Sequence, residues 1–215
     1  SGDALPFKHI LVLMMENRSF DHYYSALAKP AYYGNQIDVA DDTFSNPDPA
    51  TGTTVKRYRE TRYCIRDTPH NWDPVHESWN NGAMDGFVRV ANPNGARALG
   101  YYTDADLPFY YWLSNTFAIS DRYFSSLLGP TWPNRWFLYG ATAWGRTKTP
   151  DEPVSASELR KSPHIVKRLK EAGRSVKFYR DGAIMWPTAG FADPQMNGVH
   201  TTAFATDVKN DRLAD

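Results

Sequence analysis

The sequence predicts an α/β fold, and three observations support this prediction. The run from Lys8 to Met15 is apolar and rich in long and β-branched side chains, as in a strand buried on both faces. Residues 117–120 and 175–179 also have the composition of short strands. Helix signals separate these runs, and the order strand, helix, helix, strand favours a sheet with helices packed against it.

Two polar segments follow the first predicted strand. Polarity changes within one residue at Glu16-Asn17-Arg18-Ser19, and open α/β sheets place their sites where a central strand ends in a loop. From about residue 32 to residue 66 the composition shifts to Asn, Asp, Thr, Pro and Gly, with turn signals at Asn46-Pro47-Asp48-Pro49 and Thr51-Gly52. We expect residues 32–66 to form an irregular excursion over the surface.

The first two predicted helices follow this excursion. Asp73-Pro74 can begin a short helix, with Pro at the first helical position, that ends before Asn80. Residues 104–115 are rich in aromatic side chains and are expected to form a buried helix.

Two more helices are predicted in the second half of the chain. Thr131 is the expected N-cap of a helix that ends at Gly140. Ser162-Pro163 opens the last helix, and Gly173 is its expected C-cap. Its apolar stripe consists of Ile165, Val166, Leu169 and Ala172.

Composition excludes several classes of protein. The 215 residues can bury a core without disulfides, and 24 basic residues balance 24 acidic ones, so no net charge attracts nucleic acid. The longest apolar runs, Ile10 to Met15 and Leu107 to Leu113, fall far short of the roughly 20 residues of a transmembrane segment. Cys64 is the only cysteine, so neither an internal disulfide nor a cysteine-based zinc site can form.

The first polar cluster runs from Glu16 to His22. A carboxylate beside an amide at a strand end supplies two adjacent oxygen donors, which suit a hard or borderline divalent cation. The structural alternative is that Asn17 and Ser19 cap the following helix while Glu16 pairs with Arg18. Composition alone favours this alternative, because polar strand ends are common and metal sites are few.

The second cluster contains His70 and His76, interleaved with Trp72 and Trp79. Histidine can donate to phosphate oxygens and protonate a leaving group near neutral pH, so the cluster would suit an anionic substrate with an apolar body. Alternatively, the tryptophans pack inward and both histidines bond to backbone carbonyls. The segment by itself leaves both interpretations open.

The third cluster, Gly129 to Arg135, places Thr131 at the start of a predicted helix. A hydroxyl there lies among free N–H groups and at the positive end of the helix dipole, where a phosphate is stabilised. A metal in contact with that hydroxyl would favour its ionised form and make it a nucleophile. Otherwise Thr131 is only a cap, although a cap does not require Asn134 and Arg135 so close behind it.

Four motifs occur in order along the chain. They are Met14 to His22; His70 with Trp72 and His76; Trp79 to Gly82 followed by Met84 to Phe87; and Thr131-x-Pro133-Asn134-Arg135. From Phe7 to about Tyr179 they resemble the bacterial phosphoesterase family that contains the non-specific phospholipases C and the related acid phosphatases. Four ordered motifs are far more specific than any one of them.

The resemblance implies an alkaline-phosphatase-like fold, with a central sheet flanked by helices. Residues 1–215 would then be the N-terminal part of a single phosphoesterase catalytic domain. The resemblance also implies a divalent metal ion, zinc or calcium, bound by Glu16, Asn17 and Thr131. In the family some members carry serine where Thr131 stands.

The implied function is that of a metal-dependent phosphoric ester hydrolase of the phospholipase C or acid phosphatase type. Thr131 would attack phosphorus, and His70 would lie beside the phosphoryl group. Substrate binding is expected at His70, His76, Asn134 and Arg135. The substrate would be a phosphate ester or a phospholipid, in a secreted or periplasmic bacterial protein that contacts a membrane surface at most transiently.

The chain departs from the family in its acidic residues, because members complete the metal site with an acidic pair much later in the sequence. Here Asp41-Asp42 lies in the excursion and Asp151-Glu152 is followed by Pro153. We therefore expect the chain to be the N-terminal part of a longer enzyme, with poor activity by itself.

A second hypothesis is a non-catalytic, aromatic-rich module that binds an amphiphilic or sugar ligand. It would use Trp72, Trp79, Trp132 and Trp136. Aromatic residues are more often part of a core than of a ligand platform, so the hydrolase is the leading hypothesis. The sequence leaves open both the choice between lipid and soluble ester and the choice between zinc and calcium.

Overall fold

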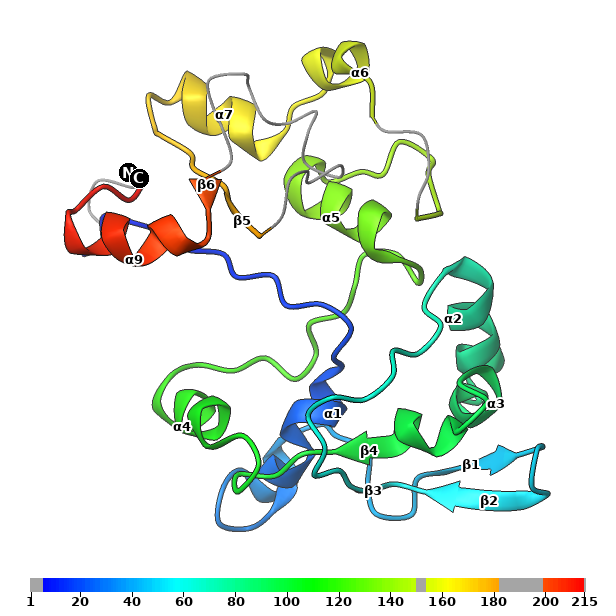
Figure 1. Ribbon diagram of the computed structural model, residues 1–215. Coiled ribbons are helices and arrows are strands. Elements are labelled where there is room, and N and C mark those ends of the chain that lie inside the picture. The colour runs from blue at the N-terminus through cyan, green and yellow to red at the C-terminus, as the bar shows by residue number, and fades with distance from the viewer. Residues whose placement is uncertain (1–5, 150–153, 182–198, 215) are drawn as a thin grey trace. The chain divides into compact units, whose positions relative to one another are not determined.

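The computed structural model describes residues 6–149, 154–181 and 199–214 (Figure 1). The chain divides into a first unit, residues 15–129, and a second unit, residues 130–215 together with residues 1–14. Helices and small two-stranded sheets occur in both units, which is consistent with an α/β fold. Among the helices of the described residues, none has both the length and the apolar character needed to cross a membrane.

The first unit contains α-helices and 3-10 helices joined by loops. They are α1 (Phe20–Tyr24), η2 (Ser25–Ala28), η3 (Gly34–Gln36), α2 (Trp72–Trp79), η4 (Asn80–Gly82), α3 (Phe87–Val90), η5 (Gly95–Leu99) and α4 (Pro108–Thr116). Ser19 caps α1, because its side-chain oxygen accepts a hydrogen bond from the backbone N–H of His22 at 3.1 Å. Pro108 opens α4, where a missing N–H leaves no helical hydrogen bond unmade.

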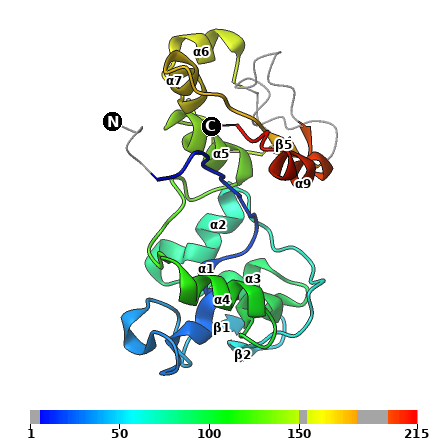
Figure 2. The ribbon, with the colours of Figure 1, turned by 90° about the vertical axis from the view of Figure 1, so that its left-hand side faces the viewer.

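The strands of the first unit form two separate pairs. Strands β1 (Ser45–Asp48) and β2 (Thr53–Lys56) are antiparallel, whereas β3 (Tyr58–Arg59) and β4 (Gly100–Tyr101) are parallel. Asn46 of β1 is fully buried; its amide donates to the carbonyl of Met84, and its oxygen accepts from the backbone N–H of Phe87. This side chain therefore ties the β1–β2 hairpin to the start of α3, which lies beside it (Figure 2).

The apolar core of the first unit joins α4 to η2. Ala26, Leu27 and Tyr111 are buried there, and the Tyr111 hydroxyl donates to the carbonyl of Tyr102 at 3.0 Å while it accepts from the N–H of Ala26 at 3.2 Å. Burial raises the pKa of Tyr111 well above that of an ordinary tyrosine. Around this core pack Tyr24, Tyr32, Tyr33, Ile37, Leu107 and Ile119.

Buried carboxylates also stabilise the first unit. Arg59 donates to both oxygens of Asp106, at 3.0 and 2.7 Å, and Asp106 also accepts from the backbone N–H and the hydroxyl of Thr103. These bonds hold the pKa of Asp106 well below its usual range. Hydrogen bonds from the Arg62 guanidinium likewise lower the pKa of Glu60 to about 2.

The apolar core of the second unit contains Trp136. Its elements are α5 (Thr131–Gly140), α6 (Ala156–Lys161), α7 (Ile165–Glu171), α9 (Thr202–Lys209) and the parallel pair β5 (Tyr179–Arg180) and β6 (Val199–His200). Trp136, Ala143, Val154 and Val166 are buried together. The last residue of α5, Gly140, approaches the Trp144 ring so closely that an added Cβ would lie 2.6 Å from a ring carbon.

The four predicted helices are confirmed, with shifted ends. They correspond to α2, α4, α5 and α7. Helix α4 begins at Pro108 rather than at residue 104, and α2 begins at Trp72, so Pro74 is its third residue and not the first as predicted. Gly173 follows the end of α7 with φ of +72°, the left-handed conformation expected of a helix-terminating glycine. Helix α4 is buried on one face only, because Phe109 and Trp112 are 61% and 54% exposed. Helices α6 and α9 were not predicted from the sequence.

The predicted buried strand from Lys8 to Met15 is wrong. These residues form no strand, and Ile10, Val12 and Leu13 are 70%, 71% and 83% exposed. A strand requires a neighbour that pairs with its backbone groups, and no strand in the described part of the chain pairs with this segment.

The other strand predictions are also corrected. Residues 117–120 continue from α4 as a loop, and of residues 175–179 only Tyr179 lies in a strand. The excursion at 32–66 is only partly irregular, because Asn46-Pro47-Asp48 lies in β1 and the turn follows at residues 49–52. Proline is compatible with such a short strand when it has no pairing neighbour on its other side.

Candidate active site

Glu16 and Asn17 lie in the loop that precedes α1. Asn17 has φ of +61°, a left-handed conformation that asparagine adopts more readily than most residues. Its amide nitrogen donates to Asp67 Oδ2 over 3.5 Å, the outer limit of a hydrogen bond. The cap of α1 is Ser19, so the cap role that the structural alternative gave to Asn17 is wrong, and the role that it gave to Ser19 is confirmed.

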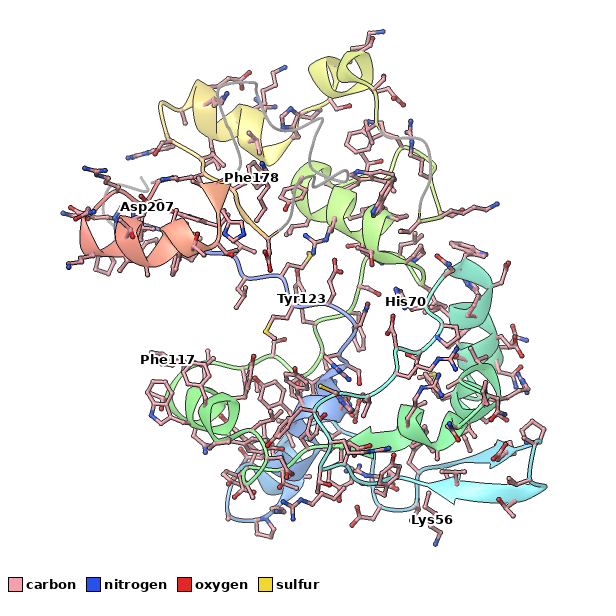
Figure 3. The ribbon with its side chains drawn as sticks, in the orientation of Figure 1. Lys56, His70, Phe117, Tyr123, Phe178 and Asp207 are labelled. Carbon is pink, nitrogen blue, oxygen red and sulfur yellow. The ribbon has the colours of Figure 1, made fainter. Side chains whose placement is uncertain are left out.

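Asp67 lies between Asn17 and His70. Its Oδ2 atom is 3.4 Å from His70 Nδ1, and the same ring nitrogen is 2.9 Å from the carbonyl oxygen of Thr68. Because both neighbours of Nδ1 are hydrogen-bond acceptors, Nδ1 carries a hydrogen and Nε2 is the nitrogen left for chemistry. His70 lies in the loop before α2 and is 39% exposed, so a substrate can reach it (Figure 3).

His76 lies on α2 and is held in a similar way. Its Nδ1 atom is 2.8 Å from the carbonyl oxygen of Trp72, and its ring centroid is 4.1 Å from the Trp72 ring. The ring of each histidine is thus hydrogen-bonded to a backbone carbonyl, as the structural alternative predicted. The inward packing predicted for Trp79 is wrong, because that side chain is 38% exposed.

The motif around Asp85 forms the turn between α2 and α3. Asn80 and Asn81 have φ of +44° and +53°, and the Asn80 amide donates to Asp85 Oδ1 at 2.8 Å. Gly86 packs against the end of α2, where an added Cβ would lie 2.1 Å from the carbonyl oxygen of Glu77. The motif therefore fixes the C-terminal end of the helix that carries His76.

The sequence predicted that Thr131 is the N-cap of α5. This prediction is wrong, because Thr131 is the first residue of the helix. The N-cap is Pro130, which has an extended backbone and makes no side-chain cap bond. The Thr131 hydroxyl still lies in the first turn, at the positive end of the helix dipole. The Asn134 amide donates to the carbonyl of Pro130 at 3.0 Å and so braces this turn.

The first turn of α5 offers few backbone donors to an anion. The N–H of Trp132 donates to the Thr149 hydroxyl at 2.9 Å, and Pro133 has no N–H. Of the first three residues of the helix, only Thr131 retains a backbone N–H without a partner among the described residues. A phosphoryl group at this end would therefore need donors from side chains in addition to the helix.

The candidate residues divide between the two units. Glu16, Asn17, His70 and His76 belong to the first unit, and Thr131, Asn134 and Arg135 belong to the second. The structure brings Asn17 and His70 together through Asp67, and it places the other three residues in the first five positions of α5. Asp67 was not predicted from the sequence, although the Asp-x-x-His spacing at residues 67–70 is a signal that could have identified it.

The donors of the first unit suit a hard divalent cation but do not complete a shell. The amide nitrogen of Asn17 faces Asp67, which leaves the amide oxygen to face a cation, and Glu16 is the adjacent carboxylate in the chain. Within residues 6–149, 154–181 and 199–214, no group of three or more His, Cys, Asp or Glu side chains is placed to hold a metal ion. Asp41 accepts from the N–H and hydroxyl of Thr43 in its own turn, and Asp151-Glu152 lies outside the described residues.

The tryptophans of the aromatic binding-module hypothesis do not form one exposed set. Trp136 is 1% exposed in the core of the second unit, and Trp132 packs against it with ring centroids 6.1 Å apart. Trp136 therefore cannot act as a ligand platform. No observation favours this hypothesis over the hydrolase.

Comparisons with known proteins identify related sequences. The sequence model described as "Phosphoesterase family" matches residues 7–214. Phospholipase C B of Mycobacterium tuberculosis is 34% identical over 261 aligned residues, which cover 99% of this chain and 49% of that protein. Non-hemolytic phospholipase C of Pseudomonas aeruginosa is 31% identical over 148 residues, 66% of this chain and 21% of that protein.

A plant protein is also similar to this chain. Non-specific phospholipase C6 of Arabidopsis thaliana is 33% identical over 153 residues, which cover 66% of this chain and 29% of that protein. The chain spans about half the length of the mycobacterial relative that it matches. The family resemblance drawn from the four ordered motifs is confirmed.

Proposed function

The chain belongs to the Phosphoesterase family, and from that premise we propose that it hydrolyses phosphoric esters through attack by Thr131, with phospholipids as the substrate class. The observation that carries this proposal is the position of the Thr131 hydroxyl in the first turn of α5, within the Thr-x-Pro-Asn-Arg motif. The substrate class follows from the names of the similar proteins, which are phospholipases C. A soluble phosphate ester, as an acid phosphatase would use, is the alternative substrate.

In the first step the Thr131 alkoxide, whose proton has passed to solvent, forms a bond to phosphorus. The bond between phosphorus and the glycerol oxygen breaks in line with it. The backbone N–H of Thr131 and the Arg135 guanidinium donate to the phosphoryl oxygens, because the N–H of Trp132 already donates to Thr149 and Pro133 has no N–H. Asn134 holds the turn in place through the Pro130 carbonyl.

His70 supplies the proton that the glycerol oxygen needs as it leaves. In this step the ring carries hydrogen on both nitrogens; acceptors hold the Nδ1–H, so the proton is transferred from Nε2 and Nε2 is left able to accept one. In the second step Nε2 takes a proton from water, the water oxygen bonds to phosphorus, and the bond to Thr131 Oγ1 breaks. The products are a diacylglycerol and the phosphorylated headgroup, and Thr131 is restored.

A divalent cation held by Glu16 and Asn17, either zinc or calcium, would stabilise negative charge on the Thr131 oxygen and on the phosphoryl group. The adjacent carboxylate and amide oxygens support this assignment, together with the amide orientation that Asp67 imposes. The alkaline-phosphatase-like arrangement, export from a bacterial cell and transient contact with a membrane surface are part of the same proposal.

The test is hydrolysis of a nitrophenyl ester of phosphorylcholine by the gene product that carries these 215 residues. Thr131→Val retains the shape but loses the hydroxyl, so we expect turnover to fall at least about 10³-fold, while Thr131→Ser keeps a measurable share. Chelation should abolish turnover, and added zinc or calcium should restore it.

Thr116→Val is the matched control, because Thr116 also lies in a helix and its hydroxyl donates to the carbonyl of Trp112. Its activity should equal that of the unaltered protein. An active Thr131→Val protein, or Thr131→Ser as inactive as Thr131→Val, would show that the nucleophile is another residue. Full activity after exhaustive chelation would exclude the metal.

A further inference from the structure

A buried arginine anchors the loop that carries Asp67. The Arg97 side chain is 7% exposed and donates to the carbonyls of Arg66 and Asp67, at 3.0 and 3.1 Å. The same guanidinium also donates to the carbonyls of Ala91, Pro93 and Asn94. Because a guanidinium presents its donors in a rigid plane, Arg97 fixes the backbone of Asp67 relative to the 91–94 segment.

The Asp67 side chain lies at the junction of two candidate site residues. Its Oδ1 atom accepts from the N–H of Thr68 at 2.9 Å, which sets the rotation of the carboxylate. Its Oδ2 atom then faces His70 Nδ1 and Asn17 Nδ2, at 3.4 and 3.5 Å. One carboxylate oxygen thus orients a neighbouring ring and an amide that is fifty residues away in the chain.

From this geometry we infer that Asp67 is the positioning residue of the site: it holds His70 with Nε2 available and Asn17 with its amide oxygen available. This inference rests on the proposed function for its catalytic consequence, but the placement of both side chains is a property of the free protein. Without the carboxylate, the hydrogen on His70 can move to Nε2, and the Asn17 amide can rotate so that its nitrogen faces the cation.

If Asp67 had only a structural role, its removal would lower the stability of the fold. The Asp67 side chain is 56% exposed, and an exposed ion pair contributes little to stability. Removing this carboxylate should therefore leave folding intact while it disturbs the two side chains that it faces. Function and stability can be separated at this residue.

The experiment compares Asp67→Asn with the unaltered protein in two measurements. The first is the ring ¹⁵N spectrum of His70 at a pH where the ring is neutral, without metal or substrate. The unaltered protein should show one tautomer, with hydrogen on Nδ1, and Asp67→Asn should show a mixture. The second is hydrolysis of the nitrophenyl ester, for which kcat should fall about 10- to 100-fold while KM stays within about threefold.

Asp38→Asn is the matched control, because Asp38 is an exposed carboxylate, 57% exposed, paired with Arg122 in the same unit. It should change neither the spectrum nor kcat, and both variants should melt within a few degrees of the unaltered protein. An unchanged His70 spectrum in Asp67→Asn overturns the inference, as does an unchanged kcat in an active enzyme. If the unaltered protein hydrolyses no ester, the proposed function fails, and the spectrum alone decides whether Asp67 orients His70.

Discussion

The two units hold their candidate residues by different means. In the first unit Asn17 and His70 lie on loops. Their side chains face the Asp67 carboxylate, which accepts from them, and Arg97 donates to the backbone of the loop that carries Asp67. In the second unit Thr131 begins helix α5, and the buried face of this helix carries Trp136. Hydrogen bonds set the direction of single atoms, whereas apolar packing positions a helix as one body. The comparison teaches that the histidine and the amide depend on individual polar contacts, while the threonine depends on the core beneath it.

The largest expected effect is that of Trp136→Ala. Truncating a buried tryptophan costs about 3–5 kcal/mol, because it removes apolar burial and leaves a cavity. The free energy of unfolding, measured in urea, should fall by that amount, and hydrogen exchange should accelerate first in α5 and α7. Trp112→Ala is the control, because Trp112 is 54% exposed on α4 and its loss should cost less than about 1 kcal/mol. Equal acceleration of exchange in α2 and α5 would contradict a specific role of Trp136 in holding α5.

A smaller loss is expected for Asp106→Ala in the first unit. The change removes an acceptor of four hydrogen bonds and leaves the Arg59 guanidinium, which is 49% exposed, to turn to water. We expect about 2–3 kcal/mol of lost stability in urea unfolding. Asp104→Ala is the control, because its exposed pair with Lys29 at 3.5 Å should contribute at most about 1 kcal/mol. Equal losses for the two variants would contradict the importance assigned to buried polar bonds in this unit.

The smallest effect distinguishes two carboxylates, one in each unit. Hydrogen bonds from Arg62 lower the pKa of Glu60 to about 2, and hydrogen bonds from Arg146 lower the pKa of Glu158 to about 2. Both pKa values lie below that of an unfolded glutamate, so each group stabilises the fold above about pH 5 and loses that contribution as the pH falls towards 2. Glu60 is 2% exposed and Glu158 is 37% exposed, so added salt should weaken the second contribution more than the first.

The measurement is thermal unfolding between about pH 6 and about pH 2, at low and high salt, for the unaltered protein and for Glu60→Gln and Glu158→Gln. Glu60→Gln should flatten the acid limb of the melting curve at both salt concentrations. Glu158→Gln should flatten it only at low salt. If salt abolishes the Glu60 contribution as well, then Glu60 is not shielded from solvent in the way its burial implies.

Local signals explain which parts of the fold could be predicted. Pro74 lies in the first turn of α2, Pro108 opens α4, and Gly140 and Gly173 mark helix ends, because the conformational limits of proline and glycine act within a few residues. Such signals did not distinguish Thr131 from Pro130 as the N-cap, since the two residues are adjacent at the start of α5. The prediction for residues 8–15 was wrong because strand formation depends on a distant partner.

The sequence by itself determined the family, the helices that carry or adjoin the site, and the residue types available for chemistry: a threonine, histidines, and an adjacent carboxylate and amide. Only the tertiary structure decided that Asp67 faces both Asn17 and His70, and that Arg97 anchors the loop that carries Asp67. The physical reason is the separation in sequence between the residues that interact. Caps, turns and apolar stripes depend on neighbours in the chain, whereas the hydrogen bonds that orient an imidazole or an amide join residues that only folding brings together.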